Sequence, residues 1–196
     1  MTIKHFDVKL SKSEITIKEM TLKNPKGFRD QIMTQIPEIY LKYDPSAFLT
    51  KREIHFNNLR FRLDQLTVIR NEKGELNINA LAALQPKGEG PPPKFKIDLL
   101  ELEIGKVIYK DYSAEASAAV QEFTVGINEK YTNITNPQDL VKLIVLRALI
   151  KTPVANLADF NINQLKESLS TTIETVGQNA IKKLFETLDE KLKQIP

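Results

Sequence analysis

The chain has 196 residues, 41% of them hydrophobic and 27% charged, which is enough to bury the core of one domain with a helical appendage. Its 28 basic residues are interleaved with 25 acidic ones, and the net charge of +3 argues against a nucleic-acid partner. The absence of cysteine excludes disulfides, thiolate metal ligands and cysteine nucleophiles.

The chain begins with alternating polar and apolar residues that predict a β-hairpin. Its strands span residues 3–10 and 14–22, with a turn at residues 11–13. A second turn is predicted at residues 24–27, because its proline fixes φ and its glycine accepts a left-handed conformation.

The next part of the chain leads into its most regular stretch, residues 53–84. Residues 31–36 leave two interpretations open, a half turn or a strand. Residues 38–43 alternate apolar and polar side chains and predict a strand. A short helical turn is predicted at residues 45–49.

Four apolar residues define the pattern of the regular stretch. Ile54 and Phe56 lie two positions apart, as do Leu59 and Phe61, which is the spacing of one strand face. The extra residue between the two pairs predicts a β-bulge that returns all four side chains to one buried face.

The same spacing occurs in three places: Ile15, Ile17, Met20 and Leu22; Ile54, Phe56, Leu59 and Phe61; and Ile97, Leu99, Leu102 and Ile104. Such a recurrence is typical of an array built from one supersecondary unit. An ordinary antiparallel meander is the alternative, because apolar alternation also recurs in β proteins.

The regular stretch ends in a predicted turn at residues 71–74 and a short helix over residues 80–84, for which Asn79 is placed as the N-cap. Residues 86–93 are rich in glycine and proline and predict a linker between two sub-units.

A second long hairpin is predicted after the linker. Its strands span residues 95–112 and 120–131, joined by residues 113–119. This joint is interpreted either as a mobile lip over a groove or as a plain loop.

From Asn136 the apolar period changes to that of a helix. Asn136 suits the N-cap, Pro137 the first helical position and Asp139 the positive helix start. The helix predicted over residues 138–150 is apolar almost all round, so it must be buried on most sides. We expect it to plug or line the concave face of the sheet.

Residues 163–195 repeat apolar side chains at steps of three and four, which predicts a long amphipathic helix. Its apolar stripe is expected to dock on the sheet or on a partner chain. Acidic residues offset its lysines and argue against a membrane surface. The candidate self-association residues are Leu169, Ile173, Val176, Leu184, Leu188 and Leu192.

Few residues are suited to catalysis or metal binding. The two histidines are His5 and His55, and His55 alternates with Ile54 and Phe56, so we expect it to point to solvent. No histidine and carboxylate spacing suits a metal, and no glycine-rich phosphate loop or serine elbow is present. The sequence therefore predicts no enzyme, no catalytic residue, no metal and no cofactor.

The order of several short motifs resembles the N-terminal module of AsmA-like bacterial proteins. That pattern is a strand, an Asn-Pro-x-Gly-Phe turn, a strand ending near Asp, and a paired strand with a glycine turn before Asn-x-x-x-Leu. The residues in these places are Asn24, Pro25, Gly27, Phe28, Asp44, Gly74 and Asn77, and LLELEIGKVIYKDYS resembles the continuation in shorter members. The resemblance covers residues 3–135.

The resemblance implies a periplasmic, membrane-anchored β-groove linked to lipid transport or outer-membrane homeostasis. The family's N-terminal signal-anchor has no counterpart at Met1, so either an anchor has been removed or the native protein lacks one. We expect a periplasmic location, associated with the inner membrane if a native anchor has been removed. Late embryogenesis abundant type 2 domains give a second resemblance, through short β modules with an Asn-Pro turn.

The predicted fold class is α+β: a mostly antiparallel, bulged, groove-like sheet followed by an apolar helix and a long C-terminal amphipathic helix. Residues 1–135 form the AsmA-like β module and residues 136–196 the helical segment. Two functions stay open. Either the apolar face binds or transports lipid, with phospholipid as partner, or it is fully packed in a structural protein that associates with itself or an envelope protein through its C-terminal helix.

The candidate lining of the lipid groove consists of Ile15, Ile17, Met20, Leu22, Ile39, Leu41, Ile54, Phe56, Leu59, Phe61, Ile97, Leu99, Leu140 and Ile144.

Overall fold

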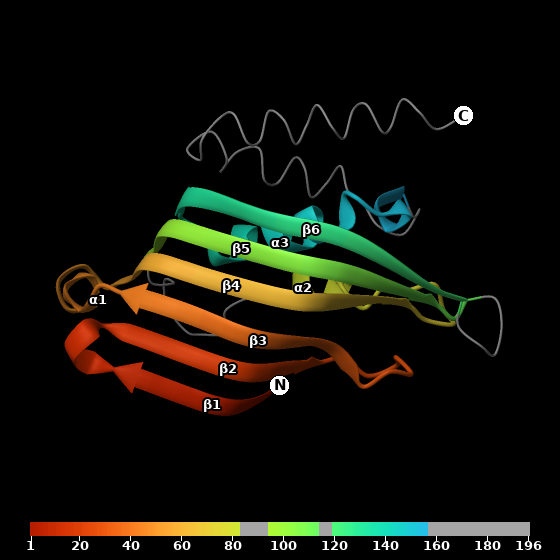
Figure 1. Ribbon diagram of the computed structural model, residues 1–196, viewed down its shortest axis with the longest axis horizontal. Helices are drawn as coiled ribbons and strands as arrows, with labels where there is room; N and C mark the ends of the chain where they lie inside the picture. Colours follow the sequence, from red (N-terminus) through yellow and green to blue (C-terminus); the bar gives the residue numbers. More distant parts are fainter. Residues whose placement is uncertain (83–93, 114–118, 157–196) are drawn as a thin grey trace.

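The computed structural model describes residues 1–82, 94–113 and 119–156 (Figure 1). The elements in chain order are β1 (Thr2–Lys9), a 3-10 turn (Leu10–Lys12), β2 (Glu14–Lys23), β3 (Ile32–Tyr43), α1 (Pro45–Lys51), β4 (Glu53–Arg70), α2 (Asn79–Ala82), β5 (Lys94–Asp111), β6 (Ala119–Ile134), α3 (Pro137–Leu149) and a second 3-10 turn (Pro153–Asn156). The predicted linker, the centre of the 113–119 joint and the C-terminal amphipathic helix lie outside the described residues.

The six strands form one sheet in sequential order, β1-β2-β3-β4-β5-β6. Every neighbouring pair is antiparallel except β4 and β5, which are parallel. The predicted α+β class with a mostly antiparallel sheet is confirmed, with one parallel pair that the sequence did not predict. The segment that was open between a half turn and a strand is the start of β3.

The parallel pair is held in register by the chain that leaves β4. The predicted turn forms there, with Gly74 at a φ of 83°. Asn77 is fully buried, and its Oδ1 accepts a hydrogen bond from the backbone of Ile69 at 2.9 Å. Its Nδ2 donates to Thr67 O at 2.9 Å and to Asn24 Oδ1 at 2.8 Å. One side chain therefore ties the crossover, the end of β4 and the β2–β3 turn together.

The bulge predicted in β4 is confirmed. The β3–β4 register changes from Lys42–Asn58 to Tyr43–Phe56, which leaves Asn57 as the extra residue. The helix predicted after β4 differs in detail, because α2 starts at Asn79 itself instead of using it as the cap.

A second irregularity crosses the sheet near its middle. In β2, Glu19 has a φ of 51°, and in β6, Gly126 has a φ of 54° where the β5–β6 register shifts. Between them, a Cβ on Gly105 would lie 2.6 Å from the backbone O of Asp64. Glycine is therefore required at Gly105 by the close approach of β4 and β5.

The three-copy repeat is not reproduced as structural units. The first copy would place Ile15 in the position of Ile54, yet Ile15 shares its cross-strand row with Leu41 and Leu59. In the third copy the buried residue after Ile97 is Leu100, and the predicted Leu99 is only half-buried. The sheet follows the alternative of a meander, interrupted by the parallel crossover.

One face of the sheet is apolar across all six strands, and we call it the apolar face. A single row of paired residues crosses it: Val8, Ile15, Leu41, Leu59, Leu100 and Tyr131. Exposure falls along this row from 40% at Val8 to 4% at Leu59 and 0% at Leu100. The face is thus buried over β4–β6 and partly exposed over β1–β3.

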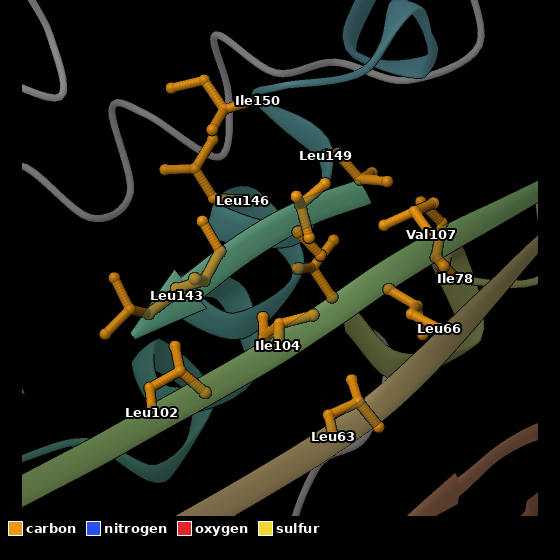
Figure 2. Close-up of a cluster of buried hydrophobic side chains, with 14 of the residues drawn as sticks. Leu63, Leu66, Ile78, Leu102, Ile104, Val107, Leu143, Leu146, Leu149 and Ile150 are labelled. Carbon is orange, nitrogen blue, oxygen red and sulfur yellow. The ribbon is translucent and has the colours of Figure 1, made fainter. Parts of the chain in front are cut away.

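α3 covers the buried half. Asn136 caps the helix and Pro137 occupies its first turn, as predicted. Leu146 and Leu149 are fully buried, and Figure 2 shows them gathered with residues of β4 and β5 such as Leu66 and Ile104. The predicted burial of this helix is confirmed, and its side chains fill the space over the sheet.

An ion pair fixes the outer side of α3. Arg147 Nε donates to Glu129 Oε2 on β6 at 2.6 Å, and Tyr131 also donates to Glu129. Burial lowers the pKa of Arg147 and raises the pKa of Tyr131. A charge buried to this degree needs its partner, so the pair fixes how the helix sits on the sheet.

We predict that Gly105→Ala lowers the free energy of unfolding by about 1–3 kcal/mol, because the new methyl group overlaps the backbone of β4. Gly126→Asn is the control, since asparagine tolerates positive φ and a Cβ there has open space. Urea denaturation measures both variants. Equal losses would contradict the close approach.

A second prediction compares two residues of one row, Ile17 and Leu102, which lie in the exposed and buried halves of the apolar face. Leu102 is 1% exposed, so Leu102→Ala should cost about 2–5 kcal/mol in urea unfolding. Ile17→Ala should cost clearly less, because Ile17 is only half-buried. A larger loss for Ile17→Ala would mean that both halves are packed.

Candidate functional site

The apolar face ends in a hollow beside α1, which we call the α1-end hollow. Its volume is about 360 Å³. It is lined by Ile15, Tyr43, Pro45, Phe48, Leu49, Ile54 and Phe56, with Asp44, Glu53 and His55. Three of these, Ile15, Ile54 and Phe56, belong to the predicted lipid lining and come from two strands, β2 and β4.

The sequence between β3 and β4 explains why α1 stands where it does. Asp44 accepts hydrogen bonds from the backbone N–H groups of Ser46 at 2.9 Å and Ala47 at 3.3 Å, which is N-capping. Pro45 fits the first turn, and Arg52 ends the helix in the left-handed region at a φ of 50°. α1 is therefore a capped helix of seven residues that turns the chain back into β4.

The orientation of α1 leaves large apolar side chains outside. Ala47 is 1% exposed and faces the protein, whereas Phe48 is 63% and Leu49 80% exposed. Phe48 and Leu49 form one wall of the hollow, and no sequence pattern had pointed to them. The feature that could have identified them is the apolar pair itself, which comes shortly after Pro45 and Ser46 at the start of the helix.

His55 lies in a polar cluster beside the hollow, and the prediction that it points to solvent is wrong. Its side chain is 14% exposed, with Nε2 at 2.8 Å from Asp98 Oδ2 and Nδ1 at 3.5 Å from Asp44 Oδ2. The ring thereby connects the cap of α1 to β5. His5 is exposed and lies 3.6 Å from Glu19, as expected for a surface residue.

Both carboxylates beside His55 have perturbed acidity. The hydrogen bond from the Ser46 hydroxyl is the largest cause that lowers the pKa of Asp44. Desolvation alone would raise the pKa of Asp98, but hydrogen bonds from Lys96 and His55 outweigh it and lower that pKa. The cluster is stabilised with both acids ionised, and this arrangement supports α1.

A second hollow of about 830 Å³ lies on the opposite face of the sheet, and the sequence did not predict it. Thr67, Lys106 and Lys110 line it, and they alternate with residues of the buried face. Its charges are paired: Lys4 with Glu19 at 2.5 Å, and Lys110 with Asp30 at 3.1 Å. Salt bridges that are already satisfied leave it with little capacity for a charged ligand.

The remaining predicted lining residues are not equally available. Leu59 at 4% exposure and Ile97 at 0% are core residues, so their assignment to an open groove is wrong. Ile17 and Leu99 are half-buried. The residues that pack half-buried against the core are Met20, Leu22, Ile39, Leu41, Phe61, Leu140 and Ile144.

The remaining predictions concern self-association, metal binding and membrane association. The candidate self-association residues lie outside the described part of the chain. Within residues 1–82, 94–113 and 119–156, no cluster of histidine and carboxylate groups is arranged to hold a metal ion. In the same ranges no helix has the length and apolar character needed to cross a bilayer.

Comparison with known proteins adds no relative from which a role could be transferred. No protein-family model, no curated protein and no solved structure matches the chain. The AsmA-like resemblance therefore depends on the order of its short motifs. Any function has to be argued from the geometry of the hollow.

Because the pKa of Asp98 is lower in the folded protein, its contribution to stability is present above the unfolded value and lost as the pH falls through and below 3.8. We therefore expect Asp98→Asn to lower the thermal unfolding midpoint at pH 6, and the difference from wild type to shrink as the pH is lowered towards about 2. A difference that stays constant between these pH values would contradict an ionised Asp98 at this site.

Proposed function

We propose that this chain is a non-enzymatic lipid-binding module that holds an acyl chain in the α1-end hollow and along the exposed half of the apolar face. The observation that carries the proposal is the hollow itself, which is lined mainly by apolar residues and is continuous with the row from Val8 to Leu41. The AsmA-like order of motifs supports the same function, in the periplasm and in lipid transport or envelope homeostasis.

Part of the apolar surface at this end of the sheet is not covered by the described chain. Ile54, the second residue of β4, is 36% exposed, whereas Ile97, which pairs with Phe56 in the row next to it, is 0% exposed. Each methylene group that leaves water for such a surface gains about 0.8 kcal/mol. A volume of about 360 Å³ is at the lower end of ligand pockets, which suits one hydrocarbon chain better than a whole lipid.

The position of α1 adds to this argument. Phe48 and Leu49 would lie against an acyl chain on one side, and Ile15 and Phe56 on the other. Asp44 and Asp98 are held in the hydrogen-bonded cluster with Ser46 and His55, where they support α1. The proposed role is to bind and shield lipid without chemistry.

A structural role is the competing function. The burial of Leu146 and Leu149 against β4–β6 favours it, since that half of the sheet offers no space to a ligand. Under this alternative the apolar face is fully packed and takes up no ligand, and the chain associates with itself or with an envelope protein. The two functions differ in whether the α1-end hollow takes up free fatty acid.

The test titrates the full chain with a fluorescent fatty acid below its micelle concentration. We expect saturable binding, and we expect Ile54→Glu to weaken it by at least about tenfold, because the carboxylate would have to be desolvated against the acyl chain. Ile32→Glu is the matched control: Ile32 is 46% exposed and lies outside the hollow. Equal affinity of both variants, or no binding by the wild type, would favour the structural role.

Native mass spectrometry of the gently purified protein, followed by lipid extraction, provides a readout without an added probe. We expect phospholipid or fatty acid to copurify with the wild type and to be reduced in Ile54→Glu.

A further inference from the structure

The end of the sheet that carries α1 also carries the first turn of the chain. The β1–β2 connection and the end of β3, which leads into α1, are joined by a hydrogen bond from Tyr43 N to Ser13 O at 2.9 Å, and Glu14 pairs with Lys42. Figure 1 shows both segments projecting at the same end of the sheet. We call this surface, formed by Leu10–Lys12 and Pro45–Arg52, the tip.

The tip carries three of the most exposed large apolar side chains of the described chain. Leu49 is 80%, Leu10 77% and Phe48 63% exposed, and among the described residues Met1 at 73% and Phe6 at 62% have similar exposure. Three such residues on two adjacent segments are unusual for a free surface of a soluble protein and mark a site of interaction.

Basic residues lie close to these apolar side chains in the chain. Lys12 follows Leu10 by two positions, and Lys51 and Arg52 follow Leu49. None of these three forms an ion pair within residues 1–82, 94–113 and 119–156. The nearby Asp44 is used in the cap of α1.

We propose that the tip docks on a lipid bilayer that contains anionic headgroups. Leu10, Phe48 and Leu49 enter the boundary between headgroups and acyl chains, and Lys12, Lys51 and Arg52 contact the phosphates. Exposed apolar side chains with basic residues next to them in the chain suit an anionic bilayer surface, where phosphates lie just outside the acyl chains. The long stems of lysine and arginine allow their charges to stay at the headgroups while the apolar residues insert.

The tip and the α1-end hollow share a wall. Phe48 and Leu49 belong to both, so an acyl chain that leaves the bilayer at the tip meets the hollow directly. This part of the inference rests on the proposed function and names its lipid source as the membrane on which the tip docks. The docking itself requires only the exposed apolar and basic residues.

The experiment measures co-flotation of the full chain with vesicles. We expect binding to vesicles of phosphatidylglycerol and phosphatidylcholine in equal parts, and weaker binding to phosphatidylcholine alone or at high salt. Leu10→Ser/Lys12→Glu should weaken binding to the anionic vesicles by about tenfold or more, because it removes one inserted side chain and reverses one charge.

The matched control is Val120→Ser/Lys26→Glu, which makes the same types of change at the opposite end of the sheet. Val120 is 59% exposed and pairs with Lys110 near the far end of β5, and Lys26 lies in the β2–β3 turn. We expect the control to bind vesicles as the wild type does. Equal binding by the tip variant and the control, or no binding by the wild type, would overturn the proposal.

A fluorescence experiment tests the same contact without weakening it. The chain contains no tryptophan, so Leu49→Trp supplies a single reporter at a side chain that is 80% exposed. Its emission should shift to shorter wavelength when anionic vesicles are added, whereas Val120→Trp should not change. A shift for Val120→Trp without a shift for Leu49→Trp would mean that the bilayer contacts the end of the sheet opposite the tip, and would contradict the proposal.

Failure of this inference and failure of the proposed function give different results. Leu10 and Lys12 do not line the hollow, so the tip variant should still bind the fluorescent fatty acid. Loss of vesicle binding with unchanged fatty-acid binding supports docking. Vesicle binding by a wild type that takes up no fatty acid would leave docking intact and refute the lipid-binding function.

Discussion

The parallel pairing of β4 with β5 is the interaction on which the rest of the structure depends. Both strands have 18 residues, and they stay paired from Glu53–Lys94 to Arg70–Asp111. Parallel neighbours need a crossover, and the buried amide of Asn77 fixes where that crossover leaves β4. The close contact at Gly105 then holds the two strands together in the middle of the sheet.

This pair divides the apolar face into a half that is covered by α3 and a half that is partly exposed. Over β4–β6 the face is covered by α3, whose leucines complete the core and whose Arg147 is anchored to Glu129. Over β1–β3 the same rows continue without a comparable cover in the described chain, and exposure rises to 62% at Phe6. Exposed apolar surface of this kind is unfavourable for a protein without a partner and is typical of a binding site. We therefore propose that a ligand covers it.

The α1 end combines the features on which the proposed function and the inferred docking depend. Asp44 acts twice there, as the N-cap of α1 and as a neighbour of His55. Because Ala47 is the residue that faces the protein, Phe48 and Leu49 must point outward. The local capping geometry thus determines both the wall of the hollow and the apolar surface of the tip.

The sequence by itself determined most of the strands, the turns, the bulge at Asn57 and the capped helix α3, since each depends on residues close in the chain, whereas the start of β3 stayed open. The tertiary structure alone decided that β4 and β5 are parallel, that Leu59 and Ile97 are core residues, and that His55 is enclosed by Asp44 and Asp98. The β4–β5 pairing and the His55–Asp98 contact join segments that are far apart in the chain, the latter with a separation of 43 residues. Alternation specifies which residues share a face, but only the pairing of distant strands determines which part of that face is covered.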